Sequence, residues 1–161
     1  MTFLITICFN EKKKIRIFIN LQIFCKNVQK IPNKKYFAKI ANHVNPFFKK
    51  NIEVNIRFVE EKEISKLSRS YKKKSKNVLT FSYDSTFPIN QGDIVICPKI
   101  LFKESKEQNK SFLNHLTHIF IHSMLHLSGF THEEKKKREK MEKIEIKIMK
   151  KIGYPNPYEI L

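Results

Sequence analysis

The sequence predicts an α+β fold in which helices pack on a small mixed sheet. Two periodicities support this prediction. Four short segments read as strands, two of them with clear alternation of apolar and polar side chains. Longer segments repeat apolar residues at helical spacing, and the longest of them carries a stripe of histidines and ends at a glycine. With 161 residues, the chain is long enough for one domain with a substantial core.

The first half of the chain predicts two strands and two helices. Residues 15–23 alternate with isoleucine at every second position from 15 to 19, which is typical of a strand. Residues 34–45 predict a helix that Pro46 ends or kinks. Residues 51–59 alternate again and predict a second strand, and residues 61–71 predict a short helix.

The second half adds two strands and two long helices. Residues 78–83 and 93–97 predict strands, separated by a turn at Asn90-Gln91-Gly92. Residues 106–128 predict the longest helix, which Gly129 ends. The last helix is predicted over residues 133–152. Acidic residues in its first turn, lysines in its last turn and Gly153 after it support both of its ends.

The charge favours a polyanionic partner. Lysine and arginine total 32 against 15 acidic residues, for a net charge of +17. Only Arg16, Arg57, Arg69 and Arg138 are arginines, and the lysines are scattered along the chain. Compositional drift and a selected RNA-binding surface both explain this pattern. With either origin, the protein binds polyanions at low salt.

The cysteines and the apolar segments indicate the cellular compartment in which we expect the protein. Cys8, Cys25 and Cys97 lie far apart and lack the spacing of a disulfide framework or a thiolate metal site, so we expect no disulfide and a cytoplasmic protein. No apolar run is long enough to span a membrane. Residues 1–9 lack a basic segment and a cleavage site, and we expect no signal peptide there.

Histidines on the longest predicted helix indicate a metal site. Four of them fall on one side of that helix, whose other sides are apolar: His115, His118, His122 and His126. His122 and His126 are four residues apart, so their imidazoles can share one ion. Gly129 can turn the chain back so that His132 supplies a third ligand. Three imidazoles leave one coordination position open for water, as in hydrolytic zinc sites.

Zinc metalloproteases share this ligand spacing, but they carry a glutamate as general base directly after the first histidine. Here that position is Ser123, which cannot take a proton from water at neutral pH. Glu133 and Glu134 lie just beyond the third ligand, with nothing in the spacing to aim them at the site. Peptide hydrolysis is therefore disfavoured.

The same residues resemble the YbeY endoribonucleases, a family of rRNA maturation factors. Its signature, HGxLHLxGYDH, is matched by residues 122–132. Residues 71–81, 92–96 and 141–158 resemble three further family segments in the same order. The resemblance covers residues 15–158 and implies a single domain over 15–161, with residues 1–14 as an extension.

The resemblance implies a four-stranded α+β fold and a metal-dependent, single-strand-specific endoribonuclease of the cytoplasm. It implies action in 3′ end maturation of small-subunit (16S-type) rRNA and in ribosome quality control, with small-subunit components as partners. One zinc ion held by His122, His126 and His132 is implied. We assign catalytic roles to His122 and Lys72, and substrate binding to Lys72, Lys73, Lys74 and His118. His118 is also open to a role in supporting the ligands.

Four departures from the family pattern bear on activity. Lys72 replaces an arginine, so a mobile point charge stands where a guanidinium would grip phosphate with two hydrogen bonds. Ser123 replaces a glycine. Thr131 replaces an aspartate that could orient a ligand. The loop after Lys72 is also shorter by two residues. The alternative to a nuclease is therefore an assembly factor that binds rRNA and cuts it weakly or not at all.

Overall fold

The computed structural model describes residues 15–26, 30–72, 77–83 and 89–159, and it confirms the predicted α+β fold. The strands are β1 (Ile17–Ile23), β2 (Asn51–Phe58), β3 (Val78–Tyr83) and β4 (Ile89–Ile96). The helices are α1 (Lys34–Val44), α2 (Glu61–Ser70), α3 (Pro98–Glu107), α4 (Phe112–Leu127) and α5 (Lys135–Lys151), with a short 3-10 helix (Asn45–Phe47) after α1. The predicted extension at residues 1–14, together with Lys73 and Lys74, lies outside the described residues.

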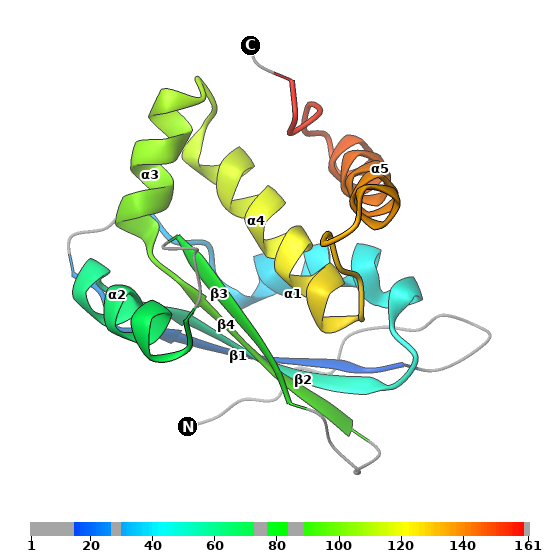
Figure 1. Ribbon diagram of the computed structural model, residues 1–161, viewed down its shortest axis with the longest axis horizontal. Coiled ribbons are helices and arrows are strands. Elements are labelled where there is room, and N and C mark those ends of the chain that lie inside the picture. The colour runs from blue at the N-terminus through cyan, green and yellow to red at the C-terminus, as the bar shows by residue number, and fades with distance from the viewer. Residues whose placement is uncertain (1–14, 27–29, 73–76, 84–88, 160–161) are drawn as a thin grey trace.

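The strands form one mixed sheet in the order β1-β2-β4-β3 (Figure 1). β1, β2 and β4 run parallel to one another. α1 lies between β1 and β2 in the sequence and supplies the crossover that this parallel pair requires. β3 lies antiparallel to β4 at one edge, with Leu79 opposite Val95. The alternation predicted for residues 51–59 is confirmed, because every second side chain of β2 from Ile52 to Phe58 is buried.

The main core lies between one face of the sheet and the helices α1 and α4, as Figure 1 shows. Phe37 of α1 packs edge-on against Phe120 of α4 at 5.1 Å between ring centroids. Helix α2 packs on a smaller cluster that includes Ile64, Leu79 and Val95. Among the helices that the structure describes, none is both long and apolar enough to cross a membrane.

The end of α4 is fixed by the glycine that the sequence singled out. Gly129 has φ +100°, and a Cβ at this position would meet nothing within 4 Å, so conformation alone selects glycine here. The amide of Gly129 donates to the carbonyl of His126 at 3.0 Å, and that of Phe130 donates to the carbonyl of Leu125 at 3.0 Å. This pair of hydrogen bonds is a Schellman motif, which turns the chain sharply after the helix.

The prediction of one helix over residues 106–128 is wrong, because two helices cover this region. Asn109 takes the left-handed conformation (φ +53°), and its amide donates to the carbonyl of Lys106 as α3 ends. The hydroxyl of Ser111 then accepts a hydrogen bond of 3.1 Å from the amide of Asn114 and caps α4. Asn109 and Ser111 therefore end one helix and begin the next, and neither lies in a helix interior.

The predicted turn at residues 90–92 is also wrong, since these residues pair within β4. A Cβ on Gly92 would lie 2.5 Å from Leu127 Cδ2 and 3.2 Å from the carbonyl oxygen of Phe81. Glycine therefore serves close packing of α4 on the strand and not a chain reversal. Cys97, predicted as the end of that strand, instead precedes α3 as its N-cap.

Candidate metal centre

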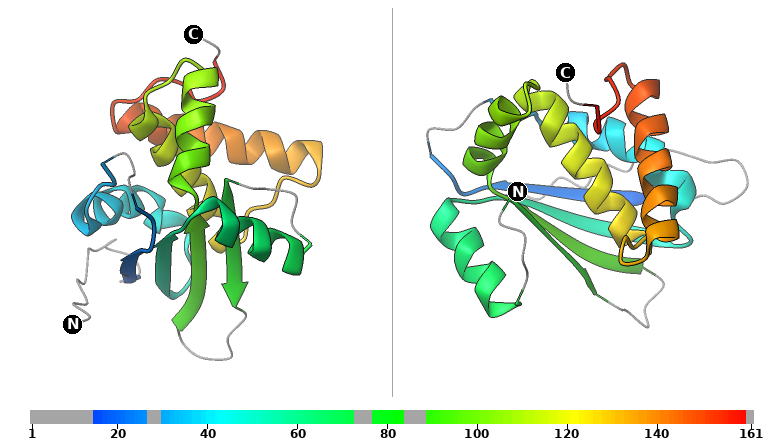
Figure 2. Two further views of the ribbon diagram at one scale, coloured as in Figure 1. Left: turned by 90° about the vertical axis from the view of Figure 1, so that its left-hand side faces the viewer. Right: turned by 45° about the horizontal axis from the view of Figure 1, so that its top comes forward.

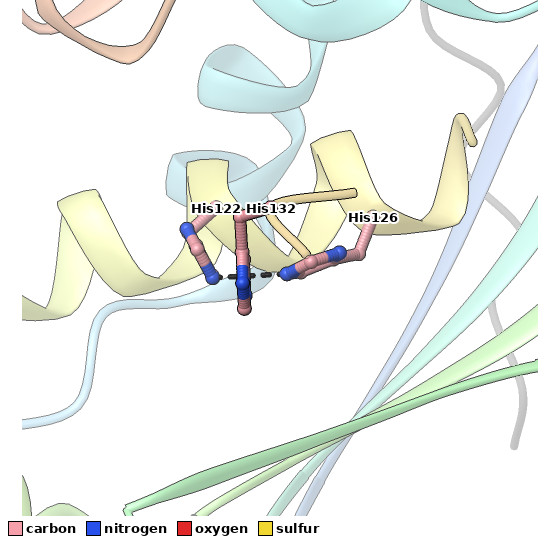
Figure 3. Close-up of side chains that lie close together, drawn as sticks. All are labelled: His122, His126 and His132. Atoms are coloured by element: carbon pink, nitrogen blue, oxygen red, sulfur yellow. Dashed lines mark hydrogen bonds between the residues drawn. The ribbon is translucent and has the colours of Figure 1, made fainter. Parts of the chain in front are cut away.

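The C-terminal half of α4 and the turn after it bring three histidines together (Figure 3). His122 and His126 project from one side of the helix, and the Gly129 turn carries His132 back beside them. One ring nitrogen of each histidine lies within 4.8 Å of the corresponding nitrogens of the other two. The arrangement predicted for the three ligands is therefore present and could hold a metal ion.

The two histidines on α4 are each oriented by a hydrogen bond at Nδ1. Nδ1 of His126 lies 2.9 Å from the carbonyl oxygen of Phe130, and Nδ1 of His122 lies 2.7 Å from Oε1 of Glu145. A carbonyl and a carboxylate only accept, so each Nδ1 carries a proton. In the neutral rings, the lone pairs of both Nε2 atoms then face one another across 3.0 Å.

Two facing lone pairs repel each other, and a proton or a metal cation between the two nitrogens removes that repulsion. Zinc–nitrogen bonds of about 2.0–2.1 Å at a tetrahedral angle place two ligating nitrogens roughly 3.4 Å apart, close to the separation found here. Burial and the neighbouring His122 lower the pKa of His126 to about 4, so this ring is neutral at pH 7, as a ligand must be. The donor set therefore fits a zinc ion.

Glu145 of α5 is the residue that sequence reasoning missed. Its side chain is fully buried, and its Oε2 lies 2.8 Å from Nε2 of His118 and also accepts the hydroxyl of Tyr158. Burial alone would raise its pKa, but the hydrogen bonds from His118, His122 and Tyr158 hold it at about 2. A carboxylate that stays ionised thus orients His118 and His122. The signal for it was an acidic residue between Met141 and Ile148 on the apolar side of α5.

The histidines open into a cleft of about 530 Å³. One wall comes from the edge strand β3, including Val78, Thr80 and Ser82, and the other from the end of α4 and the following turn. Thr131 and Glu133 also line it. Ser123, by contrast, is fully buried beneath the helix surface. The residue that replaces the protease glutamate therefore does not face the cleft.

The remaining predicted site residues lie around this centre. His118 contacts Glu145, which agrees with a supporting role, and its assignment to substrate binding stays a prediction. Lys72 is exposed just after α2, has φ +50°, and is not among the residues that line the cleft. The fourth histidine of the stripe, His115, binds Glu104 of α3 at 2.8 Å and is buried. It therefore joins two helices and does not join the ligands.

Several known proteins are similar to this chain. The family model described as "Endoribonuclease YbeY" matches residues 19–153. The chain is 43% identical over 148 residues to the Endoribonuclease YbeY of Buchnera aphidicola subsp. Acyrthosiphon pisum (strain APS), covering 88% of this chain and 95% of that protein. It is 50% identical over 111 residues to that of Ruthia magnifica, covering 66% and 77%. A solution structure of a Thermotoga maritima protein shares the fold with a TM-score of 0.53 at 24% identity, covering 88% and 99%.

Proposed function

The chain belongs to the YbeY endoribonuclease family, and from this membership we propose that it is a zinc-dependent endoribonuclease that cuts single-stranded ribosomal RNA. Its substrate would be the 3′ end of small-subunit (16S-type) rRNA during maturation and quality control. The observation that carries the proposal is the trio His122, His126 and His132 opening into a cleft. We propose one zinc ion per chain.

The residues of the site divide the work of such a reaction. His122, His126 and His132 would hold the ion, and Glu145 and the carbonyl of Phe130 would fix the two helical ligands. A zinc ion held there would lower the pKa of bound water and polarise a phosphoryl oxygen. The cleft wall of β3 offers Thr80 and Ser82, whose hydroxyls can hydrogen-bond an RNA backbone.

A single-stranded substrate suits both the cleft and the charge. Unpaired nucleotides can be splayed into a recess where a duplex presents only its grooves and backbone. The net charge of +17 favours a polyanion, and small-subunit components are the partners we propose. Cys25 and Cys97 are free thiols, and burial raises the pKa of both, which suits the reducing cytoplasm that we propose.

The experiment that tests this function measures metal content and RNA cleavage on the same purified protein. We expect one zinc per chain and cleavage of a single-stranded RNA that a chelator abolishes and added zinc restores. His126→Ala should lose both the metal and the cleavage. His43→Ala removes a histidine of α1 that lies outside the site, and this variant should keep both.

Two results would contradict the nuclease. Cleavage that survives in the double variant His122→Ala and His126→Ala would show that the histidine site does not cut RNA. Bound zinc without cleavage, together with RNA binding, would instead support the alternative of an rRNA-binding assembly factor.

A further inference from the structure

A second recess lies on the other side of the turn that carries His132. It has a volume of about 650 Å³ and is formed by the 3-10 helix after α1, the Gly129 turn and the first turns of α5. Figure 2 shows the connection between α4 and α5 beside the segment that follows α1. The residues that line it include Phe47, Lys49, Gly129, Phe130, Lys137 and Lys140. We call this recess the lysine pocket.

The lysine pocket and the metal cleft are neighbours with a common wall. Gly129, Phe130 and Thr131 line both of them. Phe130 also orients His126 through its carbonyl oxygen at 2.9 Å, while its ring contributes to the lysine pocket. A bound strand that extends from the metal cleft over the Gly129 turn would therefore enter the lysine pocket next.

The pocket offers positive charge and aromatic surface at the same place. Lys49, Lys137 and Lys140 come from two segments far apart in the sequence, and the described lining contains no acidic residue. Lys137 is partly neutralised by an ion pair of 2.7 Å with Glu134. The ammonium of Lys140 lies over the ring of Phe130 at 5.6 Å, and Phe47 packs edge-on against the same ring at 5.7 Å.

Lysines bind phosphate groups, and aromatic side chains stack on bases without preference for sequence. We propose that the lysine pocket is a second subsite for the RNA strand, in which Lys49 and Lys140 contact the phosphates of nucleotides adjacent to the one at the metal cleft and the Phe47–Phe130 pair contacts a base. This inference rests on the proposed function and extends it from one subsite to two. The shared wall and the charge of the pocket favour RNA over an apolar protein segment.

The test compares the zinc-loaded wild type with the double variant Lys49→Ala and Lys140→Ala. The control is Lys147→Ala together with Lys39→Ala, which removes the same charge from α5 and α1 outside the pocket lining. Two substrates are used: a dinucleotide, and a single-stranded RNA of about ten nucleotides, within the site sizes of single-strand binders. Cleavage gives kcat and KM, and binding is measured across a series of salt concentrations.

For the longer RNA, we expect the double variant to raise KM several-fold while kcat stays close to the wild-type value. Each lost phosphate contact lowers the slope of log affinity against log salt by about 0.7 for a single strand, so the two contacts together lower it by roughly 1.4. Cleavage of the dinucleotide should be unchanged. Phe47→Leu, which keeps apolar bulk but removes the ring, should weaken binding of the longer RNA alone.

The outcomes separate the subsite from the nuclease. If the wild type cleaves RNA and the double variant shows the same KM and salt slope as the control, the lysine pocket is not a subsite and the proposed function stands. If the wild type neither binds nor cleaves RNA, both proposals are overturned. If the double variant impairs cleavage of the dinucleotide as much as cleavage of the longer RNA, the two lysines act at the metal cleft, and the second subsite is also overturned.

Discussion

Oε1 of Glu145 lies 2.7 Å from Nδ1 of His122, so a buried carboxylate on α5 sets the proton position of an imidazole on α4. This contact fixes the imidazole with its Nε2 lone pair toward the other histidines. It also makes the packing of α5 on α4 part of the candidate metal centre. The histidine cluster therefore depends on a helix that contributes none of its three histidines.

Replacing this carboxylate by an amide should weaken metal binding without emptying the core. In Glu145→Gln the amide nitrogen can face His122 and force its proton onto Nε2, the atom that must ligate. Loss of such a supporting contact typically costs about 10–100-fold in metal affinity. Competition with a chelator of known zinc affinity measures this change.

Tyr158→Phe is the matched control, since it removes a donor to Oε2 and leaves the contact between Oε1 and His122. We expect a smaller loss of zinc affinity in this variant than in Glu145→Gln. Equal zinc affinity in Glu145→Gln and the wild type would show that the carboxylate does not orient the ligand.

The contact between α3 and α4 should make stability depend on pH. Burial would raise the pKa of Glu104, but hydrogen bonds from His115 and Asn77 hold it below its ordinary value. A carboxyl with a lowered folded-state pKa stabilises the fold above its unfolded pKa, near 4.5. It loses that contribution as pH falls through the folded value. Urea unfolding of the metal-free protein from pH 6 to pH 3 measures this loss.

Glu104→Gln isolates the contribution of this group. The free-energy difference between wild type and Glu104→Gln should be largest near pH 6 and shrink toward pH 3, where the wild-type carboxyl is protonated. A difference that stays constant over this range would show that the ionised form gives no added stability.

A carboxylate beside the third ligand should strengthen the site. Thr131 lines the cleft next to His132, where an acidic residue could hold the ring of His132 as Glu145 holds that of His122. We therefore expect Thr131→Asp to raise zinc affinity several-fold, measured by chelator competition. Thr131→Asn separates orientation from charge, since it keeps an acceptor without the charge. An unchanged affinity in Thr131→Asp would mean that His132 needs no such partner.

The sequence allowed the histidine cluster to be predicted, but not the residues that orient its members. Spacing along one helix and a glycine turn are local features, so His122, His126 and His132 could be placed together from the pattern alone. The partner of His122 lies 23 positions away on another helix, and only packing brings it close. The division between α3 and α4 was not predicted for a related reason. Asn109 takes a left-handed conformation that most residues avoid, and nothing in the sequence pattern distinguishes it from a residue inside a helix.

The Gly129 turn should tolerate no side chain without a cost to the site. Since its φ is +100° and the space around it is open, Gly129→Ala strains the backbone and clashes with nothing. We expect a loss of about 1–2 kcal/mol in unfolding free energy. The free energy of zinc binding should fall by more than this, because the turn carries His132. Gly129→Asn should lose less, since asparagine tolerates positive φ better. Equal stability of Gly129→Ala and the wild type would contradict the conformational argument.

The last prediction concerns Lys72, which lies just after α2 at the position where the family resemblance implies an arginine. If the grip of this residue on a phosphate limits the reaction, Lys72→Arg should raise kcat/KM by a few-fold, because a guanidinium donates two parallel hydrogen bonds where an ammonium gives a point charge. Lys72→Ala should lower it, and Lys62→Arg, an exposed lysine within α2, should leave it unchanged. The measurement is steady-state cleavage of single-stranded RNA by the zinc-loaded protein. If Lys72→Arg and Lys72→Ala both cleave as the wild type does, Lys72 has no part in catalysis. The groups that bind phosphate would then be those of the metal cleft and the lysine pocket.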